Sequence, residues 1–261
     1  MSMKRLFTYS MLCLLFSSCL SSKKITYFQP VNETMDEYVE KIAPVYTPII
    51  KTGDILAITV SSLNKDANAM FNPIADNGYY VQIVGTIAPL PMQGFSVDAA
   101  GEILLPIVGK VYVKGMTSKE VSILLTEKLQ EYLESPTITV RIANYTISVL
   151  GEVDRPAMYT IPNERITLPE ALALAGDMTI YGKRKNVLVV REIDGNRQYA
   201  RIDLTKRDLF ESPYYYLHAG DVVYVEPSPG RITASDRTYQ VTPIVISSLT
   251  LLVLIVNTFV K

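Results

Sequence analysis

The chain has 261 residues, of which 48% are hydrophobic and 20% charged, so its composition is that of a folded protein rather than a disordered one. Lys and Arg number 25 against 26 Asp and Glu, which excludes recognition of nucleic acid through bulk positive charge. One histidine and two cysteines are too few for a structural zinc site and leave only His218 as a catalytic imidazole, so we expect no enzyme, no metal and no cofactor.

The first residues have the pattern of an export signal. The basic pair Lys4-Arg5 precedes the apolar stretch Leu6 to Phe16, and the small pair Ser17-Ser18 leads to Cys19. The stretch is shorter than the ~20 residues that span a bilayer, and this order is typical of a secretory signal. Phe16-Ser17-Ser18-Cys19 resembles the lipobox of bacterial lipoproteins, so we expect cleavage before Cys19 and acylation of its thiol and amine. The alternative is an ordinary signal peptide with an incidental cysteine.

The two cysteines leave no disulfide in the exported chain. Cys13 lies within the signal and Cys19 would carry the lipid, so the fold has to be held by its apolar core. From Ser21 to roughly Pro44 the sequence is polar and charged. This composition predicts a tether that leads from the lipid to the first domain.

A first unit begins with turns and strands. Gly53 and Asp54 form a tight turn ahead of the strand-like run 55–60, because glycine accepts a positive φ and aspartate bonds to the nearby backbone. A strand, a turn at Gly101 and a second strand are expected over 97–106.

The only long amphipathic pattern of this unit follows. Thr117-Ser118-Lys119-Glu120 is a capping box, and the apolar residues after it recur at helical spacing until Ser135-Pro136. Apolar and polar residues then alternate over 138–142, which predicts a strand with one buried face.

A second unit repeats this order of elements. Gly151 and Pro156 punctuate two strand-like runs, and Thr167-Leu168-Pro169-Glu170 is a second capping box, whose short helix ends at Gly176. The turn Gly220-Asp221 precedes another β-branched strand, as Gly53-Asp54 does. We therefore predict an α+β fold of two small mixed domains.

A basic cluster, Lys183-Arg184-Lys185, precedes the apolar strand 187–190. Three bases could bind a phosphate or an acidic sugar. In a hairpin connection, however, they more often form a solvated turn, and we expect that here.

The last segment is uncharged from Val241 to Val260, which at ~1.5 Å per residue reaches about the ~30 Å thickness of a hydrocarbon core. We therefore expect a C-terminal transmembrane helix. Its polar residues fall mostly on one side of a helical wheel, which favours a pore-lining or oligomerising helix over a plain anchor. The expected pore-facing residues are Thr242, Ser247, Thr250, Asn257 and Thr258.

Catalytic motifs are not found in the sequence. It contains no Walker A loop, no dinucleotide fingerprint, no nucleophile elbow and no zinc-protease helix. Glu152 and Asp154 are two carboxylates beside a turn, which are usually exposed. His218 is explained by the polarity of its loop.

The ordered set of fragments resembles a known family, the outer-membrane polysaccharide export (OPX) lipoproteins. Residues 97–140 resemble the polysaccharide export domain of these proteins, and residues 149–227 resemble their SLBB (soluble ligand-binding β-grasp) domain. In its general style the chain resembles the short exporters of Bacteroidota. The fragments that carry the resemblance are Val97-x-x-x-Gly101-x-Ile103-x-Leu105-Pro106, Pro136-x-Ile138-x-Val140, Val149-x-Gly151-Glu152-Val153-x-x-Pro156 and Gly220-Asp221-Val222-x-Tyr224-Val225-x-Pro227.

The resemblance implies a ring-forming lipoprotein, with an octamer as one form of the ring, that exports capsular or extracellular polysaccharide from the periplasm to the cell surface. It implies an inner-membrane partner, a polysaccharide co-polymerase or tyrosine autokinase, and a location at the outer membrane. The runner-up is a monomeric lipid-anchored periplasmic protein that binds a glycan or other ligand, and a carboxylate-dependent hydrolase is a poorer third. The expected organisation is a signal peptide 1–18, a lipidated tether 19–44, a polysaccharide export domain 45–143, an SLBB domain 144–228, a neck 229–240 and a transmembrane helix 241–260.

Overall fold

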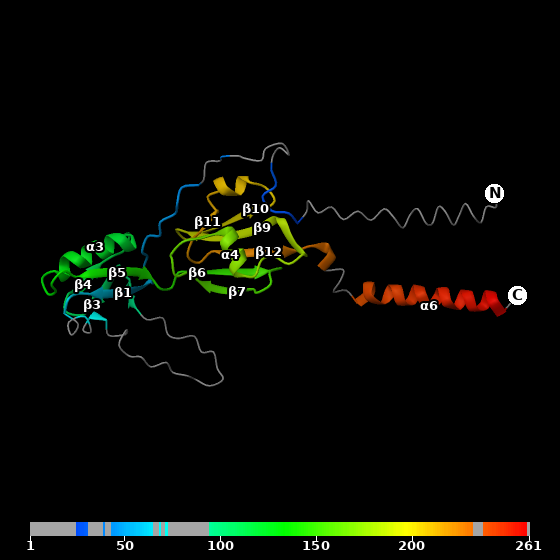
Figure 1. Ribbon diagram of the computed structural model, residues 1–261, viewed down its shortest axis with the longest axis horizontal. Coiled ribbons are helices and arrows are strands. Elements are labelled where there is room, and N and C mark those ends of the chain that lie inside the picture. Colours follow the sequence, from blue (N-terminus) through cyan, green and yellow to red (C-terminus); the bar gives the residue numbers. More distant parts are fainter. Residues whose placement is uncertain are drawn as a thin grey trace, which may run out of the picture.

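The computed structural model describes residues 25–30, 39, 43–64, 68, 71–72, 94–231 and 237–259. Two α+β bodies follow one another along the chain, and a C-terminal helix follows them (Figure 1). The expected lipid site Cys19 lies outside the described residues.

The first domain is a small antiparallel sheet with one helix. β1 lies between β2 and β5, and β3 and β4 form a separate hairpin. The helix α3 packs against β5. The elements are β1 (Ile55–Ser61), β2 (Phe95–Ser96), β3 (Glu102–Leu105), β4 (Gly109–Tyr112), α3 (Ser118–Leu129) and β5 (Thr137–Ile142).

The predicted capping box opens α3. The Thr117 side chain accepts from the Glu120 amide, and the Glu120 carboxylate accepts from the Thr117 amide. Val121, Leu125 and Leu129 form the buried stripe of the helix. The regular helix ends at Leu129, earlier than the expected stop at Ser135-Pro136, and turns carry the chain on to β5.

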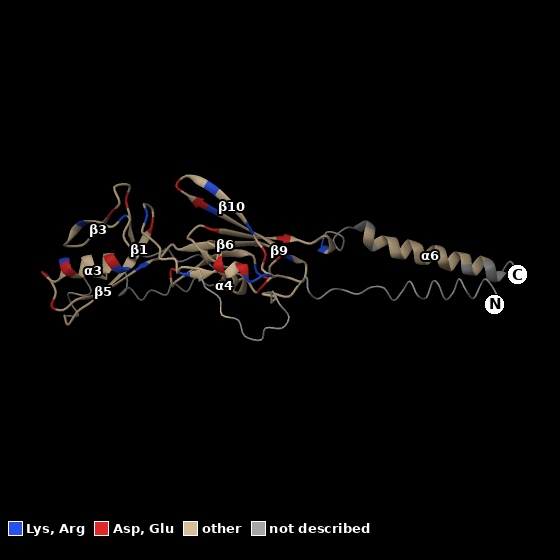
Figure 2. Cartoon of the chain, turned by 90° about the horizontal axis from the view of Figure 1, so that it is seen from above, with Lys and Arg blue, Asp and Glu red and all other residues tan. Residues whose placement is uncertain are grey.

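The second domain contains a five-stranded sheet in the order β10-β9-β12-β6-β7, in which only β12 and β6 are parallel. The short helix α4 lies on one side of this sheet (Figure 2). A capping box of Thr167 and Glu170 opens it, as predicted. The elements are β6 (Thr146–Gly151), β7 (Ala157–Thr160), β8 (Ile166–Thr167), α4 (Leu168–Leu174), β9 (Gly182–Ile193), β10 (Asn196–Ile202), η2 (Asp208–Glu211), β11 (Tyr216–Leu217) and β12 (Val222–Pro227).

The basic cluster does not lie in a solvated turn. Lys183, Arg184 and Lys185 belong to β9, and Arg184 is buried. Its guanidinium donates to the carbonyl oxygens of Thr179 at 2.6 Å, Gly182 at 3.0 Å and Met178 at 3.1 Å. The prediction was wrong because strand alternation turns the middle base inward, where backbone carbonyls receive its hydrogen bonds.

The C-terminal helix α6 (Arg237–Phe259) contains the uncharged run, with Pro243 inside it. Among the described residues, no helix combines the length and the apolar character that a membrane crossing requires. The predicted transmembrane helix is therefore wrong. The prediction rested only on the length of the run and on its lack of charge.

Candidate functional site

Several polar contacts at the junction between the two domains join distant parts of the chain. Residues 43–50 run from the second domain to the first: the Ala43 amide donates to the Phe210 carbonyl at 2.9 Å, and the Ile50 amide donates to the Met116 carbonyl at 2.8 Å. Between them, the Tyr46 ring stacks on His218 with 3.7 Å between centroids. This segment is therefore packed against both domains.

Glu164, which belongs to the second domain, also connects the two domains. It lies in the loop between β7 and β8 with a φ of +54°. Its carboxylate accepts from the Ser118 hydroxyl at 2.9 and 3.0 Å and from the Ile142 amide. Ser118 begins α3 and Ile142 ends β5, so one carboxylate from the second domain holds two elements of the first. No motif in the sequence pointed to this residue.

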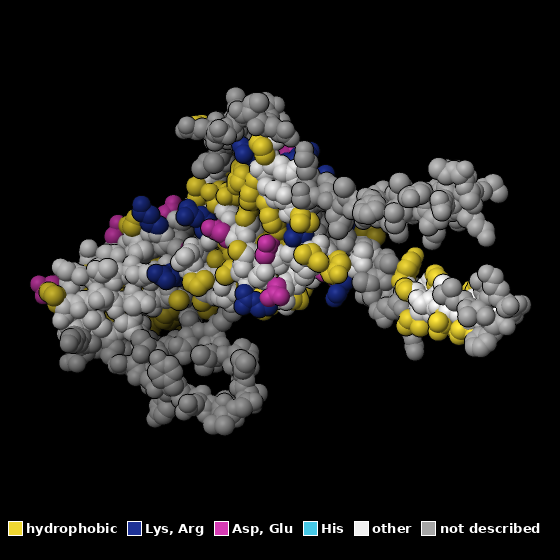
Figure 3. Space-filling model, turned by 45° about the vertical axis from the view of Figure 1, so that its right-hand side comes forward, with side chains coloured by type: hydrophobic (Ala, Val, Ile, Leu, Met, Phe, Trp, Pro, Cys, Tyr) yellow, Lys and Arg dark blue, Asp and Glu magenta, His cyan; other side chains and the backbone are white. Residues whose placement is uncertain are grey.

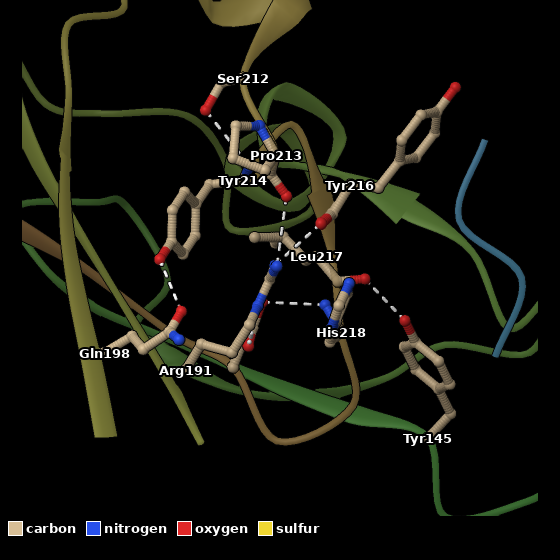
Figure 4. A network of polar contacts seen from close by, with 10 residues as sticks. Tyr145, Arg191, Gln198, Ser212, Pro213, Tyr214, Tyr216, Leu217 and His218 are labelled. Atoms are coloured by element: carbon tan, nitrogen blue, oxygen red, sulfur yellow. Dashed lines mark hydrogen bonds and ion pairs between the residues drawn. The ribbon is translucent and has the colours of Figure 1, made fainter. Parts of the chain in front are cut away.

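Arg191 is the centre of a buried polar network in the second domain (Figure 4). Its guanidinium donates to the Asp221 carboxylate at 2.7 to 3.1 Å, to the Pro213 carbonyl at 3.2 Å and to the Tyr216 carbonyl at 2.9 Å. It also lies 4.8 Å from the centroid of the Tyr214 ring. The network binds the segment before β12 to strand β9.

His218 adjoins this network as a structural residue. Its amide donates to Asp221 at 2.8 Å, and its ring stacks on that of Tyr46. Burial, helped by the charges of Arg191 and Lys51, lowers the pKa of His218 to about 4. A neutral imidazole with so low a pKa is a poor general base near neutral pH.

An apolar groove on the second domain is lined in part by the N-terminal segment. Tyr27 and Phe28 face α4 across it, and the volume of the groove is about 230 Å³. The Tyr27 hydroxyl donates to the Asp177 carboxylate at 2.6 Å, and burial raises the pKa of Tyr27. Figure 3 shows hydrophobic side chains gathered over the middle of the molecule, where this domain lies. The full lining is Tyr27, Phe28, Pro169, Leu172, Ala173, Asp177 and Leu204.

Backbone contacts hold the N-terminal segment in place. The Phe28 amide donates to the Leu204 carbonyl at 3.1 Å, and the Gln29 amide donates to the Thr205 carbonyl at 2.8 Å. The Phe28 ring lies 5.2 Å from that of Phe210. This part of the expected tether is therefore docked on the second domain. The polar composition from which the tether was predicted carried no signal for that docking.

The turn residues singled out in the sequence lie at the ends of strands and helices. Pro156 directly precedes β7, and Asp54 accepts from the Lys51 amide at 2.7 Å. Gly151 packs closest, because a Cβ there would lie 2.1 Å from the Val225 carbonyl oxygen. The φ angles are +89° at Gly53, +85° at Gly101, +90° at Gly151, +79° at Gly176 and +85° at Gly220, next to the buried Asp221.

The residues expected to face a pore lie in α6. Ser247 and Thr250 donate to carbonyls of their own helix, those of Pro243 at 2.7 Å and Ile246 at 2.8 Å. Thr242 lies in the same helix, and the side chains of Asn257 and Thr258 are outside the described part. The predicted pore-facing role required the membrane crossing that α6 does not provide.

Groups suited to metal chemistry are not assembled in the described part of the chain: no cluster of three or more His, Cys, Asp or Glu there could hold a metal ion.

The two bodies correspond to two known domain families. Residues 43–143 match the polysaccharide biosynthesis/export protein family, and residues 146–225 match the SLBB domain. The chain therefore contains a polysaccharide export domain followed by an SLBB domain, as the resemblance in the sequence predicted.

Among individual relatives, the chain is similar to the EPS I polysaccharide export outer membrane protein EpsA of Ralstonia solanacearum. The two are 29% identical over 203 residues, which are 75% of this chain and 51% of that protein. The protein of the same name from Ralstonia nicotianae is 29% identical over 140 residues, 52% of this chain and 36% of its own length. The chain thus spans about half the length of the first relative.

Proposed function

We propose that this protein exports polysaccharide at the bacterial outer membrane, carrying it from the periplasm towards the cell surface. The single observation that supports this function is the order of the domains. A match to the polysaccharide export family over residues 43–143 is followed directly by a match to the SLBB domain over residues 146–225. One relative named for polysaccharide export matches over 203 residues, more than either domain spans alone. The substrate is a capsular or extracellular polysaccharide, and the protein itself performs no chemical step.

The protein acts as a lipoprotein and as a homo-oligomeric ring, with an octamer as one form. The signal-like segment that ends at Cys19 supports lipid attachment at that residue. An inner-membrane polysaccharide co-polymerase or tyrosine autokinase supplies the energy, because a passive ring cannot drive a polymer outward. The junction at Glu164 and Tyr46 supports a fixed angle between the domains, which a ring of identical subunits needs.

The function is tested by deleting the gene and measuring polysaccharide at the cell surface and in the periplasm. We expect surface polysaccharide to be lost and periplasmic polymer to accumulate, with both restored by the full chain. A Cys19→Ser variant should leave the protein unlipidated and lower the export that it restores. Normal surface polysaccharide in the deletion strain would refute the proposed function.

A monomeric glycan-binding protein is the second candidate, and the groove between Tyr27, Phe28 and α4 is the observation that favours it. Aromatic and aliphatic surface beside one carboxylate suits the apolar face and the hydroxyls of a sugar. This candidate predicts a monomer in mild detergent whose affinity for oligosaccharides is lost on Asp177→Ala. The mass of the purified particle separates it from the ring.

A further inference from the structure

Residues 27–29, called the docked segment below, bond to the second domain through their backbone (dark blue in Figure 1). The Phe28 and Gln29 amides donate to the connection between β10 and η2, as described above. From the same connection, the Arg207 guanidinium donates to the Phe28 carbonyl at 3.2 Å. The Phe28 backbone is thus bonded at both its amide and its carbonyl, which fixes its position on the domain.

The side chains of the docked segment reach three further elements. The Tyr27 hydroxyl donates to Asp177, which lies in the loop after α4. Arg184 of β9 lies with its guanidinium carbon 5.6 Å from the centroid of the Tyr27 ring. The Phe28 ring packs on that of Phe210 in η2. Because separate elements hold consecutive residues, the docking does not depend on a single contact.

Phe28 is strained in this docked position. Its φ is +50°, in the left-handed region that a bulky side chain rarely adopts. Such a conformation persists only where the surrounding contacts impose it, and such residues cluster at clamps and switches. Release of the docked segment lets Phe28 return to an ordinary conformation. Backbone strain therefore favours release, while the contacts listed above favour docking.

Docking also shortens the chain between the second domain and the proposed lipid on Cys19. Tyr27 follows Cys19 by eight residues, which reach at most about 29 Å when fully extended. Among the described residues, the next amide that bonds to the second domain is that of Ala43. Ala43 follows Cys19 by 24 residues, which reach at most about 86 Å. Release of the docked segment therefore makes the permitted distance about three times as long.

We propose that the docked segment is a releasable clamp that sets the distance between the second domain and the membrane. When docked, it holds this domain near the lipid surface, and when released it frees the chain as far as Ala43. The inference rests on the proposed lipid attachment at Cys19 and adds a conformational device to it. A tether without the clamp would leave the longer distance open at all times.

Hydrogen exchange of the full lipidated chain in detergent measures the clamp itself. The clamp variant carries Tyr27→Ala together with Phe28→Ala. Protection of the amides at positions 28 and 29 should fall about tenfold or more in this variant, because the side chains that hold the segment are lost. The matched control is Tyr112→Ala, which removes a half-exposed ring from the first domain and should leave the protection unchanged. Equal protection in the native chain and the clamp variant would overturn the proposal.

Energy transfer to a membrane dye measures the distance. The exported chain has no free thiol if Cys19 is acylated, so Met158→Cys gives one labelling site on β7 of the second domain. The labelled full chain is placed in vesicles of phosphatidylethanolamine and phosphatidylglycerol that carry an acceptor dye on their headgroups. The clamp variant should lower the transfer efficiency to roughly half or less, because the permitted reach is about threefold longer. The Tyr112→Ala control should match the native chain.

A milder variant guards against misfolding of the double variant. Tyr27→Phe keeps the ring and loses only the hydroxyl that donates to Asp177, so protection and transfer should both lie between those of the native chain and the clamp variant. Circular dichroism should be the same for all the variants. If transfer is unchanged in the clamp variant although its amides exchange faster, something else sets the distance and the proposal is wrong.

Cys19→Ser separates this inference from the lipid attachment on which it rests. The variant should not bind vesicles, while the docked segment should remain protected from exchange. A native chain that binds no vesicles would refute the lipid attachment and with it the role of the clamp in membrane distance. Normal vesicle binding with the same transfer in the native chain and the clamp variant would refute the clamp alone, and the proposed export function would stand.

Discussion

Arg191 and Asp221 form an ion pair with 2.7 Å between Nη2 and Oδ2, and their side chains are only 4% and 1% exposed. Arg191 lies on β9 and Asp221 directly precedes β12, so the pair joins two neighbouring strands at the point where the chain enters the second of them. Two further guanidinium hydrogens bond to the Pro213 and Tyr216 carbonyls. The Arg191 guanidinium thus holds the segment that carries His218 against the sheet.

Asp221→Asn should therefore be strongly destabilising. The substitution keeps the shape of the side chain but leaves the Arg191 charge buried without its counterion, at a cost of about 3–5 kcal/mol in the free energy of unfolding. Urea denaturation followed by circular dichroism measures this loss. The matched control is Arg197→Gln, which breaks the exposed pair with Glu192 and should leave the free energy of unfolding nearly unchanged. Equal losses in the two variants would contradict the structural role of the buried pair.

Gly151→Ala should destabilise the sheet of the second domain. Gly151 has a φ of +90°, and a Cβ there would lie 2.1 Å from the backbone oxygen of Val225, which cannot rotate away. Backbone strain and overpacking together predict a loss of about 2–5 kcal/mol. Gly109→Ala has a similar φ of +81° and open space around the added methyl, so strain alone should cost about 1–2 kcal/mol. Thermal unfolding of both variants compares the two, and Gly109→Ala should be the milder.

Local features of the fold could be predicted from the sequence because their partners lie within a few residues. The capping boxes of Thr117 and Thr167 are examples, since donor and acceptor are three positions apart. The Glu164 contacts could not be predicted, because they join residues 22 and 46 positions away and the loop carries no motif. Arg191 gave a partial signal, as a charged residue at the end of an apolar strand needs a buried partner.

The two wrong predictions share a cause. Lys183-Arg184-Lys185 was interpreted from composition, without the alternation that turns Arg184 inward. The run 241–260 was interpreted from its length and its lack of charge alone, and no helix in the described part of the chain meets the requirements of a membrane crossing. The register of the five-stranded sheet depends on which strands pair, and the sequence contains no local record of the order β10-β9-β12-β6-β7. Surfaces built by non-local pairing therefore require the structure.

Glu164→Ala should loosen the junction between the domains. The Ile142 amide and the Ser118 hydroxyl would lose their acceptor, and an unsatisfied donor in a partly buried site costs about 1–3 kcal/mol. Glu164→Gln retains an acceptor oxygen and should lose less. Limited proteolysis measures the effect as faster cleavage between the domains near residue 144, alongside urea unfolding. If the Ala and Gln variants are cleaved at the same rate as the native chain, the contact does not hold the domains.

Stability should fall as the pH is lowered from about 6.5 to 4, and His218 should be one cause. Its pKa is about 4 in the folded chain, because it is buried against Tyr46 and faces the positive charges of Arg191 and Lys51, while the ordinary value is 6.5. In the unfolded chain His218 therefore binds a proton near pH 6.5, whereas in the folded chain it does not do so until about pH 4. Protonation of His218 thus favours unfolding throughout that interval. The contribution of His218 is present in full above pH 6.5 and is lost as the pH approaches 4.

Because the His218 ring is partly exposed, we expect the loss of stability to be about 1–2 kcal/mol, smaller than the full pKa shift would give. His218→Gln should remove this part of the pH dependence, while the titration of Asp221 and Asp54 stays in both proteins. Urea unfolding of the native chain and the variant at pH 7 and pH 4.5 measures the difference, and parallel stability curves for the two proteins would refute the assignment.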